Sequence, residues 1–327
     1  MNILRFEIST SLRISALVLA AAFSGQLQAS DGALEINHAC ALAGCFSGDT
    51  PGYPVTITAT GAYKLTSNIT APSTVGISVT ASGVTLDLGG FTISGPISCS
   101  GTPLACTPSA PYGPGGIQVS SVYEGVRIRN GTVKGFGSGI STGRSNVVED
   151  VTVAENQNRG IFLGDGASAR NITAIYNGRA GIETNIRAEI VDSVANYNGQ
   201  FGIALNGTTT NGGSTVRNSS AYQNGTWGIY DGGRSIIDGC KINENGGPGI
   251  ENADGGSLII NSVVTANGGA AVHLRAGLHF WEPGGTATSF AGNTFTANNG
   301  GSANPQITGP GVKRFLSPSL CGSSVCN

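Results

Sequence analysis

Between residues 139 and 272, apolar residues recur at fixed distances from a repeated asparagine. Three residues before each asparagine stand Val153, Ala174, Ala195, Ala221, Ile242 and Val264. Eight residues before it stand Val148, Ala169, Ile190, Val216, Ile237 and Ile259. Alternation of apolar and polar residues over four or five positions, broken by Gly and Asn, is typical of a half-buried strand. The pattern therefore predicts short strands throughout this region.

The asparagines form the most regular column. They are Asn156, Asn177, Asn198, Asn224, Asn245 and Asn267, at spacings of 21, 21, 26, 21 and 22 residues. A repeat of this length is shorter than the units of helical arrays and suits one turn of a coil built from short strands. When such turns stack, each apolar column becomes one wall of a continuous core. Each asparagine amide can then bond to the equivalent asparagine one coil away. We predict an all-β solenoid of about ten coils, roughly 50 Å long at about 4.8 Å per coil.

The repeated phrase also resembles a known family. Residues 198–203 (Asn-Gly-Gln-Phe-Gly-Ile) and their counterparts resemble the repeat of the pectate-lyase-like right-handed parallel β-helix superfamily. Residues 84–91 and 126–133 resemble its first coils, and the resemblance covers roughly residues 55–300. It implies a single-stranded right-handed parallel β-helix. It leaves the chemistry open, because the superfamily includes lyases, hydrolases, epimerases and proteins without catalysis.

The first residues have the features of an export signal. Arg5 and Arg13 supply positive charge, and residues 14–23 form an apolar run too short to span a bilayer. Residues 27–29 (Leu-Gln-Ala) offer a small-residue cleavage site. We predict that residues 1–29 are a signal peptide and that the protein is secreted or periplasmic, with no insertion in a membrane. An uncleaved membrane anchor is the alternative.

The seven cysteines agree with export. Six of them form three close pairs, which are Cys40 with Cys45, Cys99 with Cys106, and Cys321 with Cys326. We predict three local disulfides, which an oxidising compartment preserves, and a buried thiol at Cys240. Metal binding is the alternative for the pairs, but no pair has His or further Cys ligands at a useful spacing.

The repeat also sets the expected boundaries. We place an N-terminal cap at residues 30–53, the β-helix at 54–304, and a disulfide-closed tail at 305–327. Within the cap, residues 33–43 predict a short helix ended by Gly44, which would cover the open end of the coil. Residues 96–116 interrupt the repeat as a surface loop, and residues 275–289 form a further insertion. The first loop is either the wall of a binding cleft or a simple insertion.

Charge excludes some partners. Charged residues make up 11% of the chain and the net charge is −2, which argues against nucleic acid or an anionic membrane as a partner. An acidic polysaccharide stays open, because arginines can cluster locally. We expect a monomer.

Carboxylates are missing from the places where related enzymes use them. The turn after each repeated asparagine carries no Asp or Glu, so the two-carboxylate mechanism of inverting glycosidases has no candidates there. The Asp-Pro-His-Asp signature of the family's epimerases is absent. Glu155 and Glu244 share one column but lie four coils apart, roughly 19 Å. Asp165, Asp231 and Asp254 lie in Gly-rich turns, which turn chemistry explains. We therefore expect no cofactor, and calcium has no clear ligand cluster.

The same turn does carry side chains suited to sugars. Arg159, Arg179, Phe201 and Trp227 come from four successive coils at nearly one height, flanked by Tyr176 and Tyr197. Arginine pairs with carboxylates, and flat rings pack on apolar surfaces such as sugar faces. We predict a groove for an extended, acidic polysaccharide. If the protein is an enzyme, a polysaccharide lyase using Tyr197, Tyr222 and Lys241 as acid and base is favoured over a glycoside hydrolase. The alternative is a non-catalytic structural or surface interaction module.

Overall fold

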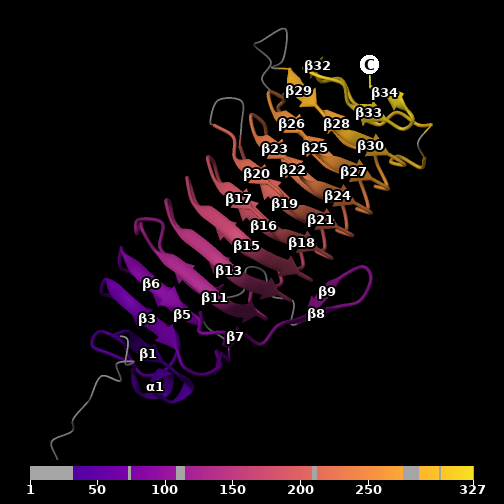
Figure 1. Ribbon diagram of the computed structural model, residues 1–327. Helices are drawn as coiled ribbons and strands as arrows, with labels where there is room; N and C mark the ends of the chain where they lie inside the picture. Colours follow the sequence, from indigo (N-terminus) through magenta and orange to yellow (C-terminus); the bar gives the residue numbers. More distant parts are fainter. Residues whose placement is uncertain are drawn as a thin grey trace, which may run out of the picture.

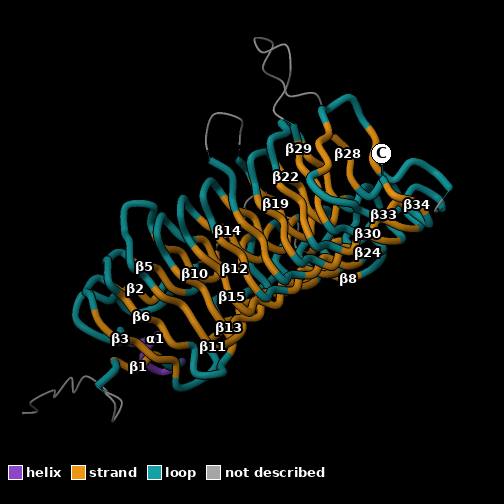
Figure 2. The backbone as a smooth tube through the Cα atoms, turned by 45° about the horizontal axis from the view of Figure 1, so that its top comes forward, coloured by secondary structure: helices purple, strands orange, loops and turns teal. Residues whose placement is uncertain are grey.

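The computed structural model describes residues 32–72, 75–107, 115–207, 212–274, 287–301 and 303–326. Its strands stack in chain order along one axis, from the indigo N-terminal end to the yellow C-terminal end (Figure 1). Seen from another side, two ribbons of strands run along the length of the molecule, and loops lie at their edges (Figure 2). The predicted all-β parallel solenoid is confirmed. The signal peptide predicted at residues 1–29 lies outside the described residues.

One strand of each coil belongs to an eleven-stranded parallel sheet, which we call sheet B. Its strands are β2 (Val55–Ile57), β5 (Ile77–Val79), β10 (Gly115–Val119), β12 (Ser138–Ser141), β14 (Arg159–Leu163), β16 (Ala180–Thr184), β19 (Phe201–Leu205), β22 (Trp227–Asp231), β25 (Ile250–Asn252), β28 (Val272–Leu274) and β31 (Ile307–Thr308). The register keeps Ile161, Ile182, Ile203 and Ile229 in one ladder. One wall of the core is therefore a stack of isoleucines.

The rest of each coil belongs to a second sheet, sheet A. In the middle coils it contributes the long strands β11 (Arg127–Lys134), β13 (Val147–Ala154) and β15 (Ser168–Ile175). In later coils the same stretch divides in two, as in β17 (Glu189–Val191) and β18 (Val194–Asn196). The division falls at a residue with left-handed backbone, such as Asp192 (φ 53°) or Asn218 (φ 50°). Asn and Asp tolerate this conformation, so each coil has three straight segments joined by corners.

The later coils repeat this division. Their sheet A strands are β20 (Thr215–Arg217), β21 (Ser220–Tyr222), β23 (Ile236–Asp238), β24 (Lys241–Asn243), β26 (Leu258–Ile260), β27 (Val263–Thr265), β29 (Thr288–Ala291) and β30 (Thr294–Thr296). The first coils use β3 (Gly61–Leu65), β4 (Ile69–Thr70), β6 (Val84–Asp87) and β7 (Thr92–Ser94). The apolar columns read from the sequence line the interior, and each of those twelve residues is at most 1% exposed.

The repeated asparagines form a hydrogen-bonded ladder at the corner between the two sheets. The side-chain amide of each donates to the side-chain oxygen of the next, at 2.8 to 3.0 Å, from Asn156 through Asn267. The same oxygens accept the backbone N–H of the preceding asparagine, as between Asn177 and Asn198 at 3.0 Å. The ladder continues beyond the sequence repeat to Asn298 and Gln306, at 2.8 and 3.0 Å. Buried polar groups are thus satisfied in series.

Serines form hydrogen bonds from coil to coil at the other two corners. The backbone N–H of Ser193 donates to Ser219 Oγ at 3.1 Å, and that of Cys240 donates to Ser262 Oγ at 3.1 Å. At the third corner Ser235 donates in the same way to Ser257 at 3.1 Å. These serines are buried, so all three corners hold polar groups that bond from coil to coil.

The N-terminal cap corrects one prediction. Helix α1 covers only His38–Ala43, with Asn37 as its N-cap. The predicted helix over residues 33–43 is therefore wrong before residue 38, where β1 (Leu34–Ile36) pairs in parallel with β3. The reason is tertiary, because the open edge of sheet A offers hydrogen bonds that a short free helix lacks. The capping helix itself is confirmed at the indigo end of the coil (Figure 1).

All three disulfides are confirmed. Cys40 bonds to Cys45, Cys99 to Cys106 and Cys321 to Cys326. Cys240 is a free and buried thiol, and burial raises its pKa to about 11. Because the thiolate is the reactive form, this cysteine is chemically quiet at neutral pH.

The C-terminal residues continue the coil. Strands β31, β32 (Lys313–Phe315) and β33 (Leu320–Cys321) pair in parallel with β28, β29 and β30. The last strand, β34 (Ser324–Val325), turns back antiparallel to β33. The Cys321–Cys326 disulfide closes this turn. Across the described part of the chain, helices are too short or too polar to cross a membrane.

Candidate functional site

Three aromatic side chains lie together on the outer face of sheet B. Phe201 and Trp227 are cross-strand neighbours on β19 and β22, and their rings stack with centroids 5.1 Å apart at 9°. Tyr230 stacks on Trp227 at 5.4 Å and 25°. We call these three residues the aromatic platform. All are half-buried, so part of each ring faces outward.

The two predicted arginines lie beside this platform, and a glutamate that was not predicted from the sequence holds them. Arg159 Nε lies 3.1 Å from Glu183 Oε2, although it is not aligned to donate a hydrogen bond. Arg179 Nη1 donates to the same oxygen at 2.5 Å. Asn206 Nδ2 donates to the other carboxylate oxygen at 3.1 Å. We call Arg159, Arg179 and Glu183 the arginine–glutamate cluster.

The cluster is in contact with the aromatic platform. Arg179 Cζ lies 5.3 Å from the centre of the Phe201 ring, and Arg159 Cζ lies 4.8 Å from that of Phe162. Cations are attracted to ring faces at this distance. The side chains of Arg159 and Arg179 are 26% and 35% exposed, whereas that of Glu183 is 5% exposed. Two arginines and one buried glutamate present one net positive charge at the surface.

The register differs in one detail from the sequence prediction. Arg159 pairs across the ladder with Ala180, which pairs with Phe201 and then Trp227. Arg179 is therefore one residue outside this row. Its side chain returns to the row by reaching Glu183, four residues later.

A second row of aromatics lies on the other side of the turn. Tyr176 and Tyr197 stack with centroids 5.2 Å apart at 13°, and Tyr222 meets Tyr197 edge-on at 5.5 Å. Tyr176 and Tyr197 are exposed, at 42% and 36%. Both have left-handed backbone immediately before a ladder asparagine, with φ of 54° and 56°. The turn and the asparagine ladder thus fix the row that flanks the predicted groove.

The three proposed acid and base residues lie on neighbouring coils. Tyr222 ends β21, and Lys241 on β24 pairs across the ladder with Ser220. The Tyr222 hydroxyl donates to Glu244 Oε2 at 3.0 Å, and Gln223 Nε2 donates to the same oxygen at 2.9 Å. The contact with Glu244 raises the pKa of Tyr222. The raised pKa favours a role for Tyr222 as the proton donor, and not as the base.

The disulfide loop reaches the same region. Strands β8 (Ser98–Ser100) and β9 (Ala105–Thr107) form an antiparallel hairpin, which projects from the side of the solenoid (Figure 1). A β-carbon added to Gly178 would lie 3.0 Å from Cys106 Sγ. The hairpin therefore rests against the residue before Arg179. Residues 108–114 of the predicted loop and residues 275–286 of the predicted insertion lie outside the described residues.

Two of the three acidic residues in the Gly-rich turns have structural partners. Asp165 accepts a hydrogen bond from Asn185, and Asp231 is fully buried. Asp231 accepts from Ser257 and Asn252, both at 2.6 Å. In the parts of the chain that the structure describes, no three His, Cys, Asp or Glu side chains gather as a metal site requires.

Asp231 makes stability depend on pH. Burial raises its pKa in the folded protein, and the hydrogen bonds from Ser257 lower it by less. The pKa of Asp231 is thus higher in the folded state than in the unfolded state, where it is near 4. The resulting stabilisation is complete below the pKa of the unfolded state and is lost as the pH rises through the pKa of the folded state. We expect the free energy of unfolding of the wild type, relative to Asp231→Asn, to fall as the pH rises from about 4. Denaturant titrations across pH measure this difference, with Asp254→Asn as control. A difference independent of pH would contradict the assignment.

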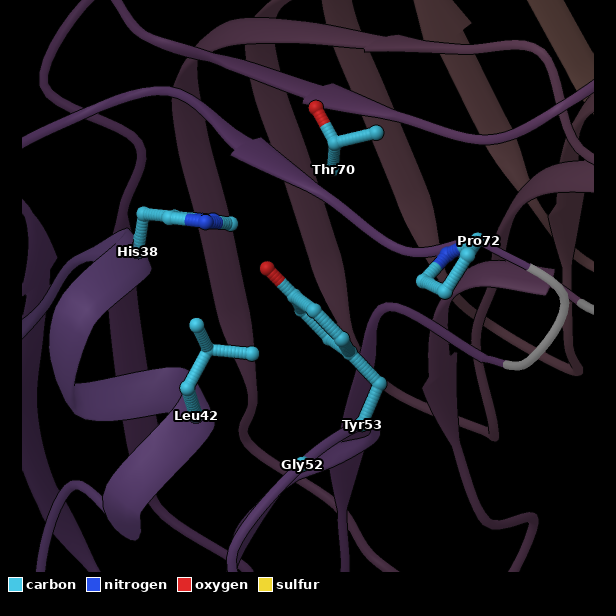
Figure 3. A pocket seen from close by; sticks show the side chains of 6 residues that line it. All are labelled: His38, Leu42, Gly52, Tyr53, Thr70 and Pro72. Carbon is cyan, nitrogen blue, oxygen red and sulfur yellow. The ribbon is translucent and has the colours of Figure 1, made fainter.

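A separate cavity of about 450 Å³ lies at the N-terminal cap. His38, Leu42 and Tyr53 surround it, together with Gly52, Thr70 and Pro72 (Figure 3). Its lining is mainly apolar, and burial raises the pKa of Tyr53. It is far along the coil from β19 and β22, so it is no part of the groove.

Comparisons with known proteins agree with this architecture. A family model described as a right handed beta helix region matches residues 166–305. No protein of curated function matches the sequence. Among solved structures, the A-module of mannuronan C-5 epimerase AlgE4 from Azotobacter vinelandii is similar, with a TM-score of 0.57 at 16% identity. That match covers 76% of this chain and 72% of the module.

Two further structures are similar. A variant of the periplasmic alginate epimerase AlgG has a TM-score of 0.60 at 13% identity, covering 88% of this chain and 84% of that one. The Dettilon tailspike protein has a TM-score of 0.50 at 16% identity, covering 80% of this chain and 59% of that one. At these identities the likeness establishes the fold alone.

Proposed function

We propose that this chain, a right-handed parallel β-helix repeat protein, binds an extended polysaccharide along the outer face of sheet B. The observation that carries this proposal is the aromatic platform aligned with the arginine–glutamate cluster. Flat, half-buried rings suit the apolar faces of sugar rings. Arginines suit carboxylates. Both sets of side chains lie on one face.

The geometry of the coil fits a linear chain of sugars. Neighbouring strands lie about 4.8 Å apart, close to the length of one sugar unit, so successive coils meet successive units. The cluster and the platform extend over β14, β16, β19 and β22. The β8–β9 hairpin and the tyrosine row stand beside this path. An elongated ligand uses all of these features, whereas a small molecule uses few.

The similar structures support this ligand class. Two of them are named as epimerases of mannuronan and of alginate, which are polysaccharides. The Asp-Pro-His-Asp signature is absent from this sequence, so we do not extend epimerisation to this chain. Binding of a polysaccharide is the part of their function that the surface of this protein supports.

Trp227 provides the direct test of binding. Replacing Trp227 with alanine removes the middle ring of the platform, and we expect affinity for the bound polysaccharide to fall about tenfold, equivalent to about 1.4 kcal/mol. A glycan array followed by calorimetry on the best ligand measures this change. Val122→Ala serves as control, because Val122 is 72% exposed in the turn after β10, which lies five strands before β22 in sheet B. Equal affinity of the Trp227 variant and the wild type would contradict polysaccharide binding at this surface.

Lyase activity is the second candidate, because Tyr197, Tyr222 and Lys241 lie on neighbouring coils beside the groove. A lyase forms an unsaturated sugar, whose absorbance reports each cleavage. We expect Tyr222→Phe to lower the rate at least 100-fold, the usual contribution of a general acid. Gln223→Ala is the control, because Gln223 also contacts Glu244 but carries no transferable proton. An absence of unsaturated products across pectin, alginate and glycosaminoglycans would contradict lyase activity and leave binding as the only proposed function.

Export and a monomeric state complete the proposal. Three disulfides close loops of five to seven residues, which favours a secreted or periplasmic protein. The capping helix and the terminal hairpin cover the two ends of the solenoid, which favours a single chain without end-to-end association. The net charge of −2 argues against a nucleic acid partner.

A further inference from the structure

We infer that the arginine–glutamate cluster is a subsite for one isolated acidic group, and that the aromatic platform binds neutral sugar units. The preferred ligand is then a polysaccharide whose carboxylates are sparse, and not a homopolymer of uronic acids. This inference rests on the proposed function and narrows its substrate class.

The cluster carries a single net positive charge. Glu183 neutralises one of the two arginines, since Arg159 and Arg179 both contact its Oε2 atom at 3.1 and 2.5 Å. The other carboxylate oxygen accepts from Asn206 at 3.1 Å. With a 5% exposed side chain, Glu183 is a fixed part of the site. One positive charge remains for the ligand, which matches one carboxylate.

The neighbouring strands of the same face offer no second cation. The outward residues of β19 and β22 are Phe201, Ala204, Trp227 and Tyr230, which carry no charge. On the next strand, Glu251 comes after Tyr230 in the ladder, but it is 1% exposed and is covered from a ligand on this face. A ligand that leaves the cluster thus meets aromatic rings and no second positive charge on these strands.

A poorly placed charge on the ligand is costly at this surface. In a homopolymer of uronic acids every sugar carries a carboxylate, so the units over the platform would hold theirs against aromatic rings. A carboxylate that leaves water without a cation or hydrogen bonds is strongly disfavoured. Neutral sugars lose no such hydration and gain ring contact. The face therefore favours a charged unit next to neutral units.

The experiment compares three groups of immobilised glycans of similar length. The first is neutral, such as xylan oligosaccharides. The second has isolated uronates, such as glucuronate-substituted xylan oligosaccharides and hyaluronan fragments. The third has contiguous uronates, such as oligogalacturonate and oligomannuronate. We expect the best ligand of the second group to bind at least fivefold more tightly than any of the third. Tighter binding of contiguous uronates would overturn this inference while leaving the proposed function intact. Binding to no glycan at all would overturn the proposed function, and this inference with it.

Two substitutions test the assignment at the cluster itself. Arg179→Gln removes the net charge, and we expect it to abolish the preference for isolated uronates over neutral glycans without weakening neutral ligands. Glu183→Gln raises the charge, and we expect at least a fivefold gain in affinity for contiguous uronates. Arg217→Gln and Glu189→Gln are matched controls, because these residues form an ion pair at 3.2 Å on sheet A. Melting temperatures confirm folding of each variant. Unchanged selectivity in a folded Arg179 variant would overturn the subsite.

Discussion

Replacing Asn198 with alanine is expected to lower the free energy of unfolding by about 4 kcal/mol, because four buried hydrogen bonds contribute about 1 kcal/mol each. Asn198 accepts from the backbone and the side-chain amide of Asn177, both at 3.0 Å. It donates to Ala174 O at 3.1 Å and to Asn224 Oδ1 at 3.0 Å. Its own exposure is 1%, so water cannot replace these partners. Alanine leaves two donors of Asn177 facing a small cavity.

Asn158→Ala is the matched control for this change. Asn158 is the same residue type in the same kind of turn, two positions after the ladder residue Asn156 and half-buried. Its contacts to neighbouring coils run through its backbone, which accepts from Arg179 N at 2.7 Å. We expect the control to cost less than about 1 kcal/mol. Denaturant unfolding followed by circular dichroism measures both variants. Equal loss in the two would show that the ladder contributes no more than an ordinary turn residue.

The ladder explains why so much of the fold could be read from the sequence. A solenoid repeats one local environment, so a residue type required at one corner appears again about 21 residues later. The asparagine column and the two apolar columns each marked such an environment. The structure adds rungs at Asn298 and Gln306. These were missed because an insertion separates Asn298 from Asn267, and because Gln306 lies only eight residues after Asn298.

The site was less predictable, because it is made across coils at positions that do not repeat. Glu183 and Tyr230 occupy equivalent outward positions of sheet B, but the residue between them in that ladder is Ala204. No column of one residue type marked this position. The sequence showed that Arg159, Phe201 and Trp227 share a row. That both arginines contact one buried carboxylate depends on side-chain direction, which spacing does not encode.

The N-terminal cap shows the same limit for local structure. Residues 33–43 are rich in Ala and Leu, which favour a helix. The first part nevertheless forms β1, where Leu34 pairs with Tyr63 and Ile36 with Leu65. Only the part after the N-cap Asn37 is helical. The edge of sheet A decides the conformation here, and the sequence of the segment alone does not reveal that edge.

Replacing Gly199 with alanine is the second large effect that we expect, a loss of about 3 kcal/mol, in the upper range for overpacked sites. A β-carbon on Gly199 would lie 2.1 Å from the carbonyl oxygen of Gly178 on the preceding coil. The atom it meets is backbone, and the backbone of Gly178 is held by its own hydrogen bond to Asn156 O at 2.7 Å. The contact is relieved only when the two coils separate. That movement strains the Asn177–Asn198 rung beside it.

The same close approach occurs in the following repeats, where glycine again comes directly after the ladder asparagine. The added β-carbon would lie 2.1 Å from the preceding coil at Gly225 and 2.3 Å from it at Gly246 and Gly268. Gly212→Ala is the matched control, because its nearest atoms are 3.4 Å away and belong to the flexible side chain of Arg187. Thermal and denaturant unfolding compare the two substitutions. A Gly199 variant as stable as the Gly212 variant would mean that the stacked turns can move apart without loss of stability. The spacing of coils that aligns Phe201 with Trp227 would then not be set by these glycines.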